Sequence, residues 1–145
     1  HTKVTAPYVR QAAKKTGTKG DIVSKYDIRF CQPNEEFMPI AGIHTLEHLV
    51  AEYIRNELDG IIDFSPMGCR TGFYLTIFGE HTEEEIANKM MNVLKQVASW
   101  QDDKEIPGRD PKECGNYKEH DLPAAKLWAK KWVDGIEQHG FNCYK

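Results

Sequence analysis

The chain has 145 residues and a formal net charge of −3, from 19 Lys and Arg against 22 Asp and Glu. That length predicts one domain over residues 1–145 with its own hydrophobic core, and 40% apolar with 28% charged residues is typical of a globular protein. No basic stretch alternates with aromatic residues, which excludes a nucleic-acid partner. No apolar run approaches the roughly 20 residues of a membrane helix. The chain starts at His1 without a Met, so we expect further sequence to precede it.

In chain order, the first 20 residues have a mixed pattern, and Lys14–Gly20 is rich in Lys and Gly. This composition predicts a solvated loop or turn. From Asp21 to Gln32 the pattern changes to alternation, with Tyr26, Ile28 and Phe30 on one side. Alternation predicts a half-buried strand, which Pro33 ends because proline cannot donate a hydrogen bond to a sheet.

A helix is predicted from Gly42 to about Leu58. Its apolar residues cover most of the circumference, so we expect it to be largely buried. One polar strip remains, made of His44, Glu47, His48 and Arg55. Buried polar groups need partners inside the protein, and a metal ion is one such partner.

Two strands and two helices follow. Ile61–Ser65 and Phe73–Phe78 are predicted strands, joined by a segment framed by glycines that carries Cys69. The second strand alternates Phe73, Leu75 and Ile77 against Tyr74, Thr76 and Phe78. Thr82 and Glu85 form a capping box for a helix that reaches about Trp100. Residues 101–120 are a long irregular segment with Cys114, and Asp121 is expected to cap a last helix that ends near Gly140. This order of elements predicts a single-domain α+β fold, with an antiparallel β-sheet packed against α-helices.

The four cysteines are widely spaced and include no C-x-x-C pair. A small secreted domain stabilised by disulfides would be denser in cysteine. We therefore expect free thiols in a reducing, cytoplasmic environment. Each thiol is then a candidate ligand, a reactive group or a packed side chain: Cys31, Cys69, Cys114 and Cys143.

The segment His44-Thr45-Leu46-Glu47-His48 carries the strongest chemical signal. Two histidines four residues apart lie on one face of a helix and can bind one metal ion, and Glu47 lies on the same side. A carboxylate beside a metal-bound oxygen is well placed to move protons. With two histidines and one cysteine, a fourth tetrahedral position stays open for water or substrate. Cys114 is the favoured third ligand, with Cys31 and Cys69 as rivals.

Five ordered segments resemble the S-ribosylhomocysteine lyase (LuxS) family: residues 6–10, 27–33, 43–49, 65–69 with 71–72, and 113–115. The resemblance implies one divalent metal per subunit, Fe(II) natively with Zn or Co possible in purified protein, held by His44, His48 and Cys114. It implies cleavage of the thioether of S-ribosylhomocysteine to homocysteine and 4,5-dihydroxy-2,3-pentanedione, the precursor of the quorum-sensing signal autoinducer-2. By the same resemblance, a bound metal would polarise the sugar carbonyl, the carbonyl would migrate from C1 to C2 to C3, and the thiolate would leave by β-elimination.

The resemblance also implies roles for individual side chains. Cys69 and Glu47 are the two acid/base groups, and Arg29 supplies positive charge for a Cys69 thiolate. The substrate pocket is implied to be lined by His1, Arg29 and Asp63. Members of the family are homodimers with shared active sites, to which the partner subunit contributes His1 and Arg29. They also place a serine before His1 against the ribose, and this position is absent from the present sequence.

Four further expectations stand beside these. Arg10 and Asp27 are interpreted as salt-bridge or surface residues. H-x-x-E-H is also the pattern of inverzincin metallopeptidases, in which Glu47 would activate water. The site could instead belong to a structural metal-binding module, closed by a second cysteine. For the two histidines alone, a pair of surface residues on an amphipathic helix is a further interpretation.

Overall fold

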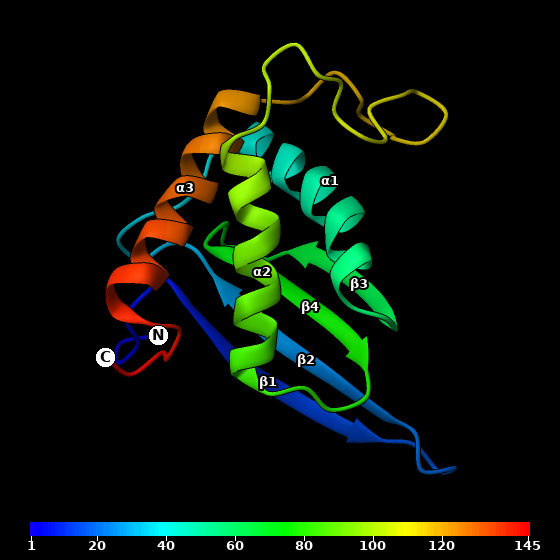
Figure 1. Ribbon diagram of the computed structural model, residues 1–145, viewed down its shortest axis with the longest axis vertical. Coiled ribbons are helices and arrows are strands. Elements are labelled where there is room, and N and C mark those ends of the chain that lie inside the picture. Colours follow the sequence, from blue (N-terminus) through cyan, green and yellow to red (C-terminus); the bar gives the residue numbers. More distant parts are fainter.

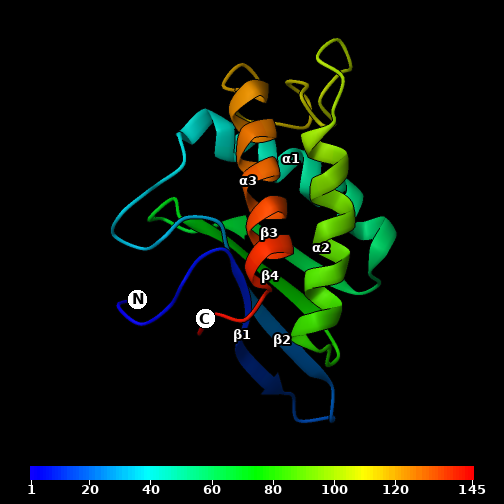
Figure 2. The ribbon, with the colours of Figure 1, turned by 60° about the vertical axis from the view of Figure 1, so that its left-hand side comes forward.

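The computed structural model describes residues 1–145 and contains a four-stranded antiparallel sheet and three helices (Figure 1). The strand order is β1-β2-β4-β3. All three helices lie on one face of the sheet (Figure 2), which confirms the predicted α+β fold. The elements are β1 Tyr8–Thr16, β2 Ile22–Arg29, α1 Ile40–Glu57, β3 Ile61–Pro66, β4 Gly72–Phe78, α2 Glu83–Ala98 and α3 Leu122–His139. No helix combines the length and the apolar character that crossing a membrane requires.

Strand β1 lies where the sequence predicted no regular element. It pairs with β2 from Tyr8 opposite Arg29 to Thr16 opposite Ile22, with a bulge between Gln11 and Ala13. It is an edge strand whose last three residues are exposed. Its sequence therefore shows no alternation of apolar and polar residues that would predict a strand. The loop predicted for residues 14–20 is therefore wrong for 14–16, and the turn is confined to the residues that follow.

The face of the sheet that meets the helices forms the core. The predicted alternation in β4 is confirmed, because Phe73, Leu75 and Ile77 are fully buried while Phe78 is 54% exposed. These side chains belong to one cluster of 29 buried residues that extends into all three helices. Burying apolar surface of this extent is the main stabilising contribution to the fold.

The predicted strand is confirmed as β2, but the prediction that it is half-buried is wrong for its second half, from Tyr26 to Arg29. Asp27 and Arg29 point away from the helices, yet they are only 0% and 3% exposed. Two β1 residues stand directly opposite them, Tyr8 opposite Arg29 and Arg10 opposite Asp27. The expected salt bridge is confirmed, with Arg10 Nη2 3.2 Å from Asp27 Oδ2. Buried charges on this face are thus paired and hydrogen-bonded, as burial requires.

Helix α1 starts at Ile40, two residues before the predicted start, and is less buried than predicted. Its exposed side includes Glu52, Arg55 and Asn56, while His44 and His48 are only partly buried. The predicted caps of α2 and α3 are confirmed. Thr82 Oγ1 accepts a hydrogen bond from the N–H of Glu85 at 3.0 Å, and the Asp121 carboxylate accepts from the N–H of Ala124 at 3.0 Å.

Candidate metal centre

Four metal-binding side chains meet where α1 faces the loop between α2 and α3. The structure brings His44 and His48 of α1 together with two loop residues, Cys114 and His120. Their ligand atoms all lie within 4.8 Å of one another. Cys114 Sγ is 3.3 Å from His44 Nε2. The cluster therefore contains the three residues expected from the sequence and one that was not expected.

The other three cysteines lie outside this cluster. Cys69 is exposed on the turn between β3 and β4, and Cys31 and Cys143 are buried elsewhere. Burial, the largest cause, raises the pKa of the Cys31 thiol to about 12. A thiol with so high a pKa is a poor metal ligand, because the ligand form is the thiolate.

Each α1 histidine is oriented by a carbonyl of the α2–α3 loop. His44 Nδ1 is 2.6 Å from the Glu119 carbonyl oxygen, and His48 Nδ1 is 2.8 Å from the Pro107 carbonyl oxygen. A carbonyl only accepts, so both Nδ1 atoms carry the proton and donate it. The Nε2 atoms are then left with free lone pairs, which is the arrangement usual for metal-binding imidazoles.

The two free Nε2 atoms are 3.0 Å apart. Two lone pairs at this distance repel each other unless a cation lies between them. A proton can join two such atoms, but it cannot also be bound by Cys114, whereas one metal ion can be bound by all three side chains. Imidazole and thiolate donors suit zinc, iron and related transition metals. The residues therefore fit one divalent transition metal.

His120 is the member of the cluster that the sequence reasoning missed. Its ring stacks on that of His44, with centroids 4.1 Å apart. Its Nδ1 is 3.0 Å from Thr45 Oγ1, whereas its buried Nε2 has no hydrogen-bond partner. Burial, with smaller effects from His44 and His48, lowers the pKa of His120 to about 4, so the ring is neutral at neutral pH. A neutral ring with an unpartnered buried nitrogen is consistent with a metal nearby.

Two local features bring the α2–α3 loop close to the histidines of α1. Asp110 holds the turn that presents Cys114, since its carbonyl accepts from the N–H of Cys114 at 2.9 Å and its carboxylate accepts from the N–H of Lys112 at 2.8 Å. Gly108 has a φ of +70°, and a Cβ at that position would lie 3.2 Å from His48 Nδ1. Glycine thus allows the loop backbone to come close to His48.

Glu47 and Asp63 share a cleft of about 370 Å³ with His48. Glu47 is on α1, one residue before His48, and Asp63 is on β3. Pro107 and Gly108 of the α2–α3 loop form part of the lining. A carboxylate that shares a cleft with a candidate metal ligand can exchange protons with a molecule bound there.

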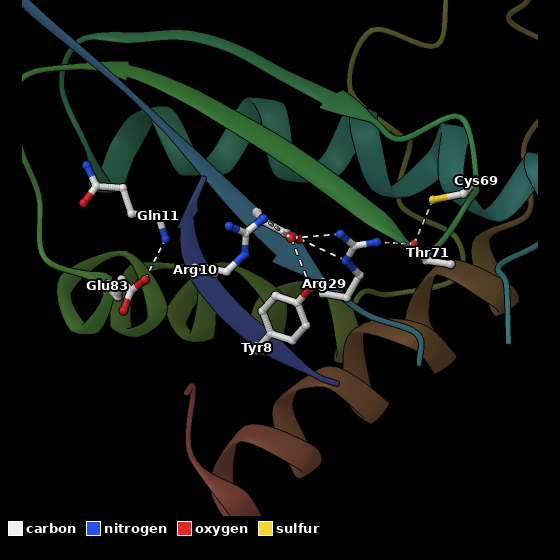
Figure 3. A network of polar contacts seen from close by, with 8 residues as sticks. Tyr8, Arg10, Gln11, Arg29, Cys69, Thr71 and Glu83 are labelled. Atoms are coloured by element: carbon white, nitrogen blue, oxygen red, sulfur yellow. Dashed lines mark hydrogen bonds and ion pairs between the residues drawn. The ribbon is translucent and has the colours of Figure 1, made fainter. Parts of the chain in front are cut away.

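His1, Arg29 and Cys69 share a second cleft, of about 250 Å³. Here Cys69 Sγ is 2.9 Å from Thr71 Oγ1, and Arg29 Nη1 donates to the same Oγ1 at 2.8 Å (Figure 3). Partial desolvation raises the pKa of Cys69, but hydrogen bonds from Thr71 and the positive charge of Arg29 bring it below its ordinary value. A lowered pKa favours the nucleophilic and basic thiolate.

The expected site residues therefore form two groups. One cleft contains Glu47 and Asp63 beside the metal cluster, and the other contains His1 and Cys69 beside Arg29. Arg29 reaches the Cys69 thiol through Thr71 of the same chain. Arg29 and Cys69 therefore belong to the same group.

Comparison with known proteins gives a consistent result. The family model described as S-Ribosylhomocysteinase (LuxS) matches residues 1–142. An S-ribosylhomocysteine lyase of Streptococcus pneumoniae is 50% identical over 146 residues, covering 98% of this chain and 89% of the relative. An S-ribosylhomocysteine lyase of Pediococcus pentosaceus is also 50% identical, over 98% of this chain and 91% of the relative.

Proposed function

The chain belongs to the S-ribosylhomocysteinase (LuxS) family, and on this premise we propose that it cleaves the thioether of S-ribosylhomocysteine. The products are homocysteine and 4,5-dihydroxy-2,3-pentanedione. The observation that carries the proposal is the pair of Nε2 atoms of His44 and His48, which lie 3.0 Å apart beside Cys114 and so fit a single metal ion. We assign His44, His48 and Cys114 as its ligands, and Fe(II) as the native metal. When bound, the metal supplies Lewis-acid polarisation of the substrate carbonyl.

Cys69 and Glu47 carry the proton transfers. One group removes a proton from the carbon next to the carbonyl and the other returns a proton at the adjacent position, which moves the carbonyl along the sugar. In the last step a base takes the proton beside the carbonyl, and the C–S bond breaks with both electrons going to sulfur. The homocysteine thiolate then takes up a proton. The lowered pKa of Cys69 supports its assignment as a base at neutral pH.

We further propose that the active site forms between two copies of the chain. His1, Arg29 and Cys69 of one chain face the metal ligands, Glu47 and Asp63 of the other. The separation of these residues into two clefts supports this arrangement. Two large apolar side chains near the start of α1 are exposed: Phe37 in the preceding loop by 61%, and Ile40, the first residue of the helix, by 58%. Exposed apolar side chains of this size favour a subunit contact.

Mixing two inactive variants tests the shared site. In a heterodimer of Cys69→Ala and Glu47→Gln chains, one site lacks both groups and the other has both. Random exchange of subunits would then restore about one quarter of the wild-type activity. If Cys69 and Glu47 of the same chain act together, the mixture stays inactive.

The alternatives are less well supported. Inverzincin peptidases take a distant glutamate as third ligand, whereas the third and fourth members of this cluster are Cys114 and His120. The closed structural site required a second cysteine, and the cluster contains only one. Partial burial of both histidines within a four-residue cluster also argues against a pair of unrelated surface residues.

The experiment for the reaction uses protein reconstituted with Fe(II) without oxygen. S-ribosylhomocysteine is added and a thiol reagent detects homocysteine. We expect thiol release from the wild type. Cys69→Ala and Glu47→Gln should each keep the metal and lose turnover by about 10²-fold or more, the usual scale for acid/base groups. No thiol release by metal-loaded wild type would contradict the proposal.

A further inference from the structure

We propose that Thr71 is a positioning residue, which holds Cys69 as a thiolate by connecting it to the buried guanidinium of Arg29. This inference rests on the proposed function in one respect, the role of Cys69 as a base. It adds a residue to which the sequence reasoning gave no role. The series of contacts begins with the ion pair of Asp27 and Arg29. Figure 3 shows how it continues from Arg29 through Thr71 to Cys69.

Arg29 is held rigidly by its neighbours in this series of contacts. Its Nε and Nη2 donate to the two carboxylate oxygens of Asp27 at 3.0 and 2.8 Å. Asp27 also accepts from the Tyr8 hydroxyl at 3.1 Å and from Arg10 Nη2 at 3.2 Å. The backbone carbonyl of Arg29 accepts a hydrogen bond from Trp132 Nε1 of α3 at 3.1 Å. A two-point ion pair fixes the orientation of a guanidinium, so Nη1 is aimed in one direction, at Thr71.

The direction of the next hydrogen bonds follows from their chemistry. Arginine has no acceptor, so Thr71 Oγ1 accepts from Arg29 Nη1 at 2.8 Å. The side chain of Thr71 is buried, and its hydroxyl has only Arg29 and Cys69 as partners. If the thiol donated to Oγ1, the hydroxyl proton would be left without an acceptor. The hydroxyl therefore donates to the sulfur, and a hydrogen bond to a charged thiolate is stronger than one to a neutral thiol. The arrangement therefore favours the ionised sulfur.

The backbone keeps Thr71 in place while Cys69 remains accessible. The Thr71 carbonyl accepts from the N–H groups of Phe30 and Cys31 at 2.9 and 3.0 Å. At Gly72 the two backbones are so close that a Cβ would overlap with the Ile28 carbonyl oxygen. Cys69, two residues before Thr71, is exposed. A fixed hydroxyl beside an accessible sulfur is suited to hold a base and leave it open to a substrate.

The groups that face Cys69 agree with this role. Arg29 contributes positive charge, and His1 lines the same cleft. Cys31 is the other titratable group in its surroundings, and burial keeps that thiol neutral. The pKa of Cys69 is lowered chiefly through Thr71, with a smaller effect from Arg29, although its burial opposes the shift. The Thr71 hydroxyl and the positive charge of Arg29 thus both stabilise the thiolate.

The test measures alkylation of Cys69 by iodoacetamide as a function of pH, read from the peptide that contains Cys69, in metal-loaded protein. Thr71→Val keeps the shape of the side chain and removes the hydroxyl. We expect its alkylation midpoint to move to higher pH, and the rate at pH 7 to fall by about tenfold, the size of a lost hydrogen bond to a charged group. Thr71→Ser keeps the hydroxyl and should retain the wild-type pH profile.

Two results would overturn the inference: a wild-type pH profile in Thr71→Val, or the same displaced profile in Thr71→Ser. Thr71→Ala provides a second variant without the hydroxyl if the valine variant does not fold, and it should show the same displacement. Because alkylation needs no turnover, this outcome is separate from the proposed reaction. Absence of thiol release from S-ribosylhomocysteine would contradict the reaction and leave the alkylation result intact.

Discussion

Replacing Gly108 with alanine tests how the α2–α3 loop holds the metal centre. Gly108 has a φ of +70°, and the added Cβ would lie 3.2 Å from His48 Nδ1. A non-glycine residue in the left-handed region costs about 1 to 2 kcal/mol, and the close contact adds to this cost. The loop can relieve both by moving away, which breaks the 2.8 Å hydrogen bond between His48 and the Pro107 carbonyl. Loss of such a supporting partner typically weakens metal binding by about 10- to 100-fold, or about 1.4 to 2.7 kcal/mol.

The assay is competition with a chelator for Co(II) or Zn(II), with thermal unfolding of the metal-free protein as a measure of folding. Gly115→Ala is the matched control, since it lies in the same loop and a Cβ there meets nothing within 4 Å. We expect Gly108→Ala to bind metal more weakly and Gly115→Ala to bind it as the wild type does. Equal affinity in all three proteins would refute the idea that the Pro107 carbonyl orients His48.

Three other predictions concern the cysteines and the buried ion pair. Cys114→Ala should lose the metal, measured by elemental analysis of the folded variant, and retention of a full equivalent would exclude Cys114 as a ligand. Asp27→Asn leaves the Arg29 guanidinium buried without its charge partner, and should lower the free energy of unfolding in urea by about 3 kcal/mol or more; a loss under about 1 kcal/mol would contradict this. Between pH 7 and 8, iodoacetamide should modify Cys69 long before Cys31, because the pKa of Cys69 lies below its ordinary value while that of Cys31 is raised to about 12. Equal rates of modification of the two cysteines in the native protein would contradict this prediction. In urea-unfolded protein the two rates should be equal.

The sequence predicts those elements that carry their own local signal. Alternation marked β4, and the Thr82 and Asp121 caps marked the starts of α2 and α3. β1 lacked such a signal, because an edge strand is held by its pairing with β2 rather than by an apolar pattern. The burial of Asp27 was also hidden, since it depends on Arg10 and other side chains brought alongside by that pairing.

The same distinction applies to the site. His44 and His48 could be identified because helical spacing places them on one face. His120 lies 75 residues beyond Thr45, to which it hydrogen-bonds, in a segment without regular structure. Its position six residues after Cys114 was the only available hint. Thr71 was hidden for another reason, because its role depends on the direction of the Arg29 side chain. That direction is fixed by Asp27 of the same strand, which is in turn held by Tyr8 of β1.

The most direct test of metal-dependent thioether cleavage is a titration of the metal-free protein with Fe(II) without oxygen, while homocysteine release from S-ribosylhomocysteine is followed. Since His44, His48 and Cys114 form one cluster, we expect the rate to rise in proportion to bound metal and to level off at one equivalent per chain. A metal-free protein that releases homocysteine at the full rate, or a fully loaded protein that releases none, would contradict the account.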